Sequence, residues 1–193
     1  MDRKLKKKLV SALKLFFTIG TLFLLGACFP SKDIFFEPSA EGGKVMKARC
    51  KGHVGYPSYI DFEREGIFIE IGLVLEKEIM SFYLRIPSGV SVSFRSNEFI
   101  WISGSESYPL RPKSIETVTF ARPYDKQTIP VDEQQVLQGG PYDAYFMYFD
   151  VPIKEVNNFS FLVPPVRINE KEVTLPPIKF ILKSGWYIYP INC

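Results

Sequence analysis

The chain has 193 residues, of which 46% are hydrophobic and 23% charged, with a formal net charge of +3. A chain of this length can form one domain with a hydrophobic core, and it is too short for two domains of ordinary size. One histidine and three cysteines leave little material for a catalytic or metal site built on those residue types.

The first 27 residues have the pattern of a signal peptide. Asp2–Lys8 is a compact cationic stretch, and Leu15–Ala27 is an uncharged run of 13 residues. A helix that crosses the hydrocarbon core needs about 20 apolar residues, so this run fits a cleaved segment better than a permanent span. We therefore expect residues 1–27 to be removed.

The run ends in Leu25-Gly26-Ala27-Cys28. This sequence resembles the lipobox of bacterial lipoprotein precursors, in which an aliphatic and two small residues precede a nucleophilic cysteine. The resemblance implies that Cys28 becomes a lipidated amino terminus, anchored by several acyl chains. Because Phe29 stands where Asp would be associated with inner-membrane retention, it also implies an outer-membrane location facing the periplasm or cell surface. A free cysteine behind an uncleaved anchor helix is the alternative.

Removal of residues 1–27 reverses the sign of the net charge. These residues hold six of the 24 bases and one of the 21 acids, so the rest of the chain carries 18 bases, 20 acids and a formal charge of −2. Nucleic-acid binding depends on a surplus of Lys and Arg that neutralises phosphates. We exclude that class of partner.

Residues 28–43 are punctuated by Pro, Ser and Gly and predict a flexible tether, in which Ile34–Phe36 could dock on the domain or reach the lipid headgroups. The domain proper is expected over residues 44–193. It holds Cys50 and Cys193, an even pair that fits an oxidising compartment and predicts a disulfide bridge. Such a bridge would contribute roughly 4 kcal/mol on chain-entropy grounds. Two separate buried thiols are the alternative.

Alternation of apolar and polar residues dominates from Lys44 onward. It is clearest over 67–75, which predicts a half-buried strand. Further strands are expected over residues 79–86, 90–94, 99–102, 116–120, 142–151, 159–163, 178–182 and 186–191, and a hairpin over 166–175 that turns near Asn169. A short helix is expected between Pro130 and Gly140, with Asp132 as its cap. The pattern predicts an all-β, antiparallel β-sandwich, plausibly immunoglobulin-like, with a closed barrel as the alternative.

Residues that could carry chemistry are sparse, and we expect neither an enzyme nor a cofactor or metal. His53 lacks partners for a triad or zinc site, and Ser103-Gly104-Ser105 lacks a general base. Two sets of carboxylates alternate along the chain and would share a strand face, namely Asp61, Glu63 and Glu65, and Glu76 and Glu78. Asp132-Glu133 fits a helix start better than a calcium loop.

Aromatic residues are the feature most suggestive of binding. They crowd two strands, at Tyr142, Tyr145, Phe146, Tyr148 and Phe149, and again at Trp186, Tyr187 and Tyr189. Their apolar faces and polar edges suit sugar rings, peptides or a partner protein. Core packing is the stronger interpretation, because a strand that is apolar on both faces is usually covered on both sides.

The preferred functional hypothesis is a membrane-anchored, non-catalytic module that binds another envelope protein or a glycan. A structural or assembly role in the envelope is the first alternative. A hydrolase that uses His53 or a carboxylate pair is the second.

Overall fold

The computed structural model describes residues 28–49, 54–119, 125–132, 135–140 and 144–190. The chain divides into two compact units, one made of residues 1–33 and 185–193 and the other of residues 34–184. No helix in the described ranges is long and apolar enough to span a membrane.

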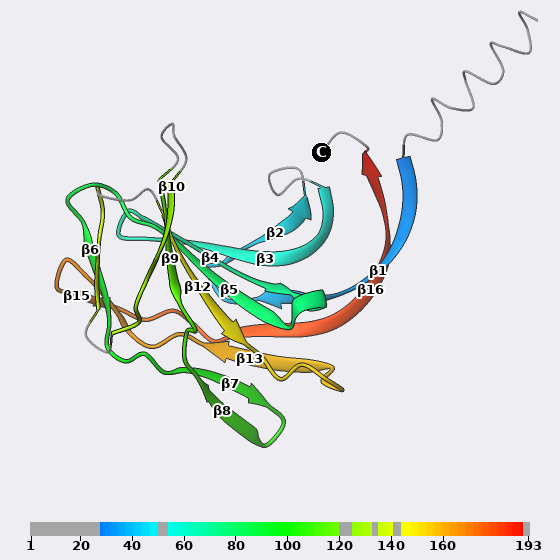
Figure 1. The fold of residues 1–193 in the computed structure, drawn as a ribbon. Helices are drawn as coiled ribbons and strands as arrows, with labels where there is room; N and C mark the ends of the chain where they lie inside the picture. Colours follow the sequence, from blue (N-terminus) through cyan, green and yellow to red (C-terminus); the bar gives the residue numbers. More distant parts are fainter. Residues whose placement is uncertain (1–27, 50–53, 120–124, 133–134, 141–143, 191–193) are drawn as a thin grey trace, which may run out of the picture. The chain divides into compact units, whose positions relative to one another are not determined.

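Three antiparallel sheets account for nearly all regular structure in the described residues (Figure 1). The five-stranded sheet has the order β1 (Cys28–Ser39), β16 (Ile178–Pro190), β13 (Asn158–Leu162), β7 (Phe99–Ser103) and β8 (Glu106–Leu110). The seven-stranded sheet has the order β10 (Asp125–Ile129), β9 (Ile115–Thr119), β12 (Ala144–Asp150), β5 (Ile79–Arg85), β4 (Ile67–Val74), β3 (Val54–Arg64) and β2 (Lys44–Arg49). The four-stranded sheet has the order β11 (Val136–Gln138), β6 (Ser91–Phe94), β14 (Val166–Ile168) and β15 (Lys171–Val173).

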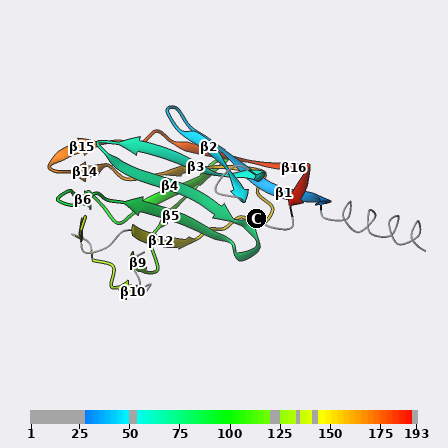
Figure 2. The ribbon, with the colours of Figure 1, turned by 90° about the horizontal axis from the view of Figure 1, so that it is seen from above.

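The core of the unit formed by residues 34–184 lies between sheets. Ring centroids of Phe99 on β7 and Phe149 on β12 are 4.6 Å apart, and those of Phe99 and Phe82 on β5 are 5.6 Å apart. These contacts join the five-stranded sheet to the seven-stranded one, and all three side chains are buried. Figure 2 shows β3, β4, β5 and β12 side by side in the second of these sheets. The arrangement is sandwich-like, with alternate side chains filling the space between layers.

The predicted all-β class is confirmed, and the alternating segments form strands. The segment that starts at Ile67 is β4, whose alternate residues Ile67, Ile69, Ile71 and Leu73 are buried. The hairpin expected near Asn169 joins β14 to β15. An immunoglobulin-like arrangement is not confirmed, because the strands are distributed over three sheets. The two strands expected after residue 178 form the single strand β16.

The flexible tether expected over residues 28–43 is corrected, because residues 28–39 form β1. Phe35 and Phe36 are buried, and Phe36 packs against Phe159 of β13 with 5.2 Å between ring centroids. The prolines of this segment suggested a loop, but β1 is the edge strand of its sheet, where a missing N–H can be tolerated. Phe35 and Phe36 therefore dock on the domain, whereas Ile34 is 59% exposed.

The helix expected between Pro130 and Gly140 is also wrong for the residues described there. Val136–Gln138 forms β11 and pairs with β6, with Leu137 opposite Val92. Leu137 is buried whereas its two neighbours are exposed, which is the alternation of a strand. Burial of this one leucine and pairing with β6 outweigh the weak local preference for helix.

Candidate functional site

Four aromatic side chains gather on the surface of the seven-stranded sheet that is turned away from the core. Phe68 lies on β4, Tyr83 on β5, and Phe146 and Tyr148 on β12, and all four are partly exposed. Ring centroids are 5.9 Å apart for Phe68 and Tyr83, 4.8 Å for Tyr83 and Phe146, and 6.3 Å for Phe146 and Tyr148. These four residues form a continuous surface that we name the aromatic face.

Strand register explains why the four rings meet. Tyr83 lies opposite Phe146 across the β5–β12 pair, and Phe68 lies opposite Arg85 across the β4–β5 pair. Successive side chains of a strand point to opposite faces of the sheet. The apolar residues that alternate with them, such as Phe82, fill the core, so these aromatics must point outward.

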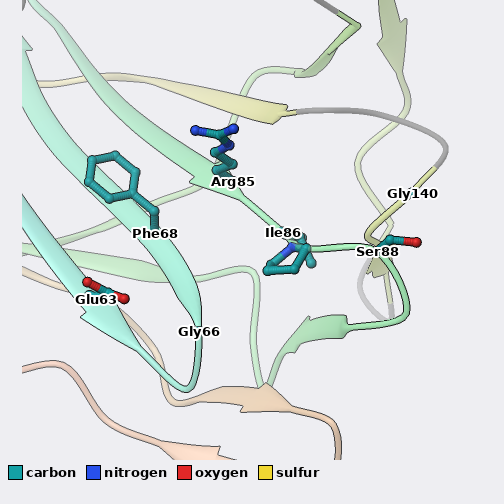
Figure 3. Close-up of a pocket in the computed structure, with 8 residues that line it drawn as sticks. Glu63, Gly66, Phe68, Arg85, Ile86, Ser88 and Gly140 are labelled. Carbon is teal, nitrogen blue, oxygen red and sulfur yellow. The ribbon is translucent and has the colours of Figure 1, made fainter.

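A cavity of about 640 Å³ opens at one end of the aromatic face (Figure 3). Its lining includes Glu63, Phe68, Arg85 and Ser88. Phe68 lies between Glu63 and Arg85 because the three residues are in register across β3, β4 and β5. Arg85 is exposed and makes no ion pair within the described part of the chain. The cavity thus places an available guanidinium group and a carboxylate on either side of an aromatic ring.

A close backbone contact holds the far wall of this cavity. Ser88 lies in the turn after β5, and Gly140 lies across from it (Figure 3). A Cβ atom on the preceding Gly139 would lie 1.8 Å from the Pro87 carbonyl oxygen, and the Gly139 amide donates to the Val90 carbonyl at 2.8 Å. Only glycine permits this approach of the two segments.

A pair of carboxylates borders the aromatic face on β3 and β4. Asp61 lies directly opposite Glu70, which in turn lies opposite Tyr83. Burial, and secondly the Asp61 carboxylate, raise the pKa of Glu70 to about 7. Burial raises the pKa of Asp61 to about 6 against the opposing effect of Lys44, and its buried Oδ1 has no hydrogen-bond partner among the described residues. Near neutral pH the pair can offer both an acceptor and a protonated donor.

The carboxylate sets expected from the sequence are only partly brought together. Asp61 and Glu63 share the outer side of β3. Glu65 instead lies in the following turn, where its carboxylate forms an ion pair with the Lys171 ammonium group at 2.6 Å. Glu76 lies in the 3₁₀ turn Leu75–Lys77 and Glu78 caps it, so these two do not share a strand face. Ser103 ends β7, and its hydroxyl donates to the Asn158 carbonyl at 3.0 Å.

The aromatic residues predicted as binding candidates are divided between several places. Tyr145 is 3% exposed and belongs to the core, where its hydroxyl donates to the Gln138 carbonyl at 2.7 Å. Tyr148 belongs to the aromatic face. Trp186 is 71% exposed and Tyr187 partly exposed, both in the unit that contains residues 185–193. Tyr189 lies on β16, and its side chain and all of Tyr142 lie outside the described residues.

Several other predicted positions fall outside the described ranges. Cys50, Cys193 and His53 are among them, so the disulfide bridge and any role of the histidine stay predictions. Cys28 is the first residue of β1. No cluster of potential metal ligands is found among the residues that the structure covers.

The sequence reasoning missed Phe68, Tyr83 and the Asp61–Glu70 pair. A signal for the first two was available, because both are aromatic residues at the polar positions of alternating strands. The two-residue turn Glu65-Gly66 fixes the register of β3 against β4 and so places Asp61 opposite Glu70. Comparisons with protein-family models, with curated proteins and with solved structures found no match.

Proposed function

We propose that this chain is a lipid-anchored, non-catalytic module of the bacterial envelope that binds a glycan on its aromatic face. The observation that carries the binding role is the continuous, partly exposed surface formed by Phe68, Tyr83, Phe146 and Tyr148. The lipobox-like sequence that ends at Cys28 supports the anchor and the compartment. The outer membrane, facing the periplasm or the cell surface, is the location that this resemblance implies.

A sugar polymer fits the chemistry of this surface. A pyranose ring has an apolar C–H face that packs on an aromatic ring and a rim of hydroxyl groups that hydrogen-bonds to carboxylates. Glu63 and the Asp61–Glu70 pair supply such groups on the neighbouring strands. Arg85 supplies a cation for an acidic substituent. Peptidoglycan combines amino-sugar rings with carboxylates and is therefore the glycan of choice for a test.

The test is co-sedimentation of the mature protein with purified peptidoglycan sacculi. Phe146→Thr removes the central ring and keeps a residue suited to a strand, so we expect the apparent Kd to rise about tenfold. Tyr108→Thr is the matched control, because Tyr108 is an exposed aromatic residue on β8 of another sheet. Equal binding by wild type and Phe146→Thr, with both folded, would remove the aromatic face as the site.

The same samples test the alternative of a hydrolase that uses His53 or a carboxylate pair. Of the described carboxylates, Asp61 and Glu70 form the pair that the structure brings together. Neither carboxylate lines the cavity beside Phe68. We expect no release of reducing sugars from sacculi during incubation. Release by wild type that is lost in Glu70→Gln would instead make the protein an enzyme.

A further inference from the structure

The segment that follows the proposed lipidation site enters a strand at once. Cys28 is the first residue of β1, and β1 pairs with β16 in the five-stranded sheet. The start of β1 and the end of β16 belong to one compact unit, in which Figure 1 shows them side by side. With no spacer between Cys28 and this strand pair, acyl chains on Cys28 would hold the pair close to the bilayer.

Trp186 stands out on this strand pair. Its side chain is 71% exposed, the largest value among the big hydrophobic residues that the structure describes as exposed. The chain around it reads Trp186-Tyr187-Ile188-Tyr189-Pro190, without a charge. Lys32, on the described start of β1, is exposed as well. An exposed indole ring and an exposed cation in the same compact unit are a combination that favours the boundary between lipid headgroups and hydrocarbon.

The place of Trp186 near the end of β16, which lies beside the start of β1, fits such a contact (Figure 1). Trp186 precedes the last residue of β16 by four positions, which corresponds to about 13 Å along a strand. A strand pair that lies along the bilayer surface brings a side chain at that distance into the headgroup layer. Exposure of a large indole ring to water costs free energy that this contact would recover.

We propose that Trp186 inserts into the headgroup layer of the membrane that holds the lipid of Cys28, and that this second contact fixes how the start of β1 and the end of β16 lie on the bilayer. This inference rests on the proposed lipid anchor. The acyl chains supply the hold on the membrane, and the ring restricts rotation about that single point of attachment.

The chain contains two tryptophans, and this makes the proposal directly measurable. Trp101 is 1% exposed in the core, so Trp101→Phe leaves Trp186 as the reporter. The lipidated full-length mature protein is reconstituted into vesicles of phosphatidylethanolamine and phosphatidylglycerol, with and without bromine on the acyl chains near the headgroups. We expect the Trp186 emission to fall by roughly half with the brominated lipids, because quenching requires contact at interface depth. The Trp186→Phe variant, which retains Trp101, should not be quenched.

Wild type measured against Trp186→Phe gives the same comparison if Trp101→Phe does not fold. Flotation with the vesicles and intact mass are recorded for every sample. Protein that is acylated and floats, yet shows no bromine quenching of Trp186, overturns the contact and leaves the anchor standing. A shift of Trp186 emission without quenching would place the ring against protein, such as a second copy of this chain, and also overturns it. Protein that lacks acyl mass and does not float would contradict both the proposed lipid anchor and the proposed contact of Trp186.

Discussion

Arg85 is the residue whose environment most clearly calls for a ligand. Its guanidinium group lines the cavity beside Phe68 and has no ion-pair partner within the described residues. Arginine recognises carboxylates with two parallel hydrogen bonds. An acidic substituent on the glycan would therefore be bound at this end of the aromatic face.

We expect Arg85→Gln to raise the apparent Kd for sacculi about tenfold, because a charge-assisted hydrogen bond is lost. Co-sedimentation at low and high salt measures this effect, and the difference between wild type and variant should shrink at high salt. Arg167→Gln is the control, since Arg167 is exposed on β14 of the four-stranded sheet. If both variants bind like wild type, the cavity does not contribute to recognition.

The Asp61–Glu70 pair predicts a pH dependence of stability. The folded chain keeps protons on these carboxyls up to pKa values of about 6 and 7, whereas their ordinary values are 3.8 and 4.5. The folded state thus binds more protons than the unfolded chain in this range, and the free energy of unfolding falls as the pH rises from about 4 to 7. Glu70→Gln fixes the neutral form and should be more stable than wild type at pH 8 by about 1–2 kcal/mol, discounted for solvent screening.

Urea unfolding of wild type and Glu70→Gln between pH 4 and 8 measures this difference. It should vanish at pH 4, where both side chains are neutral. Glu63→Gln, an exposed position on the same side of β3, should unfold like wild type at each pH. A constant difference between wild type and Glu70→Gln over this pH range would contradict the assigned environment of Glu70.

At the scale of elements, the sequence predicts the strands correctly where one face of the strand is buried and the other is exposed. β4 is the clearest example, since a shift of one residue would expose its row of isoleucines. The sequence did not predict β1 and β11 as strands. Their pairing partners, β16 and β6, are distant in the sequence, and their own alternation of apolar and polar residues is short or interrupted by proline. The aromatic face likewise depends on register between β4, β5 and β12, which local periodicity does not provide.

The backbone of the turn between β14 and β15 is strained, and this strain can be tested. Asn169 and Glu170 have φ values of 45° and 71°, the left-handed conformation that two-residue hairpins require. Asparagine tolerates this conformation, whereas glutamate pays a steric cost at the second position. Glu170→Gly should raise the free energy of unfolding by about 0.5–1 kcal/mol, measured by urea unfolding. Glu170→Ala keeps the strained backbone and serves as the control, so an equal gain from both variants would point to charge instead.

At the scale of the whole molecule, the proposed lipid anchor and the proposed glycan site would act together. A module that binds a glycan while lipidated would connect a membrane to a polymer of the envelope. The predicted disulfide bridge between Cys50 and Cys193 fits the oxidising envelope compartment in which such a module would lie. Labelling of thiols in the unfolded mature protein should find neither cysteine reactive until reductant is added, and two reactive thiols before reduction would contradict the bridge.

The anchor is tested most directly by intact mass and membrane fractionation of wild type and Cys28→Ala. We predict that wild type begins at Cys28, carries acyl mass and fractionates with membranes, and that Cys28→Ala loses the acyl mass. Wild-type protein that retains residues 1–27, or that is recovered without acyl mass in the soluble fraction, would contradict a lipid-anchored envelope module.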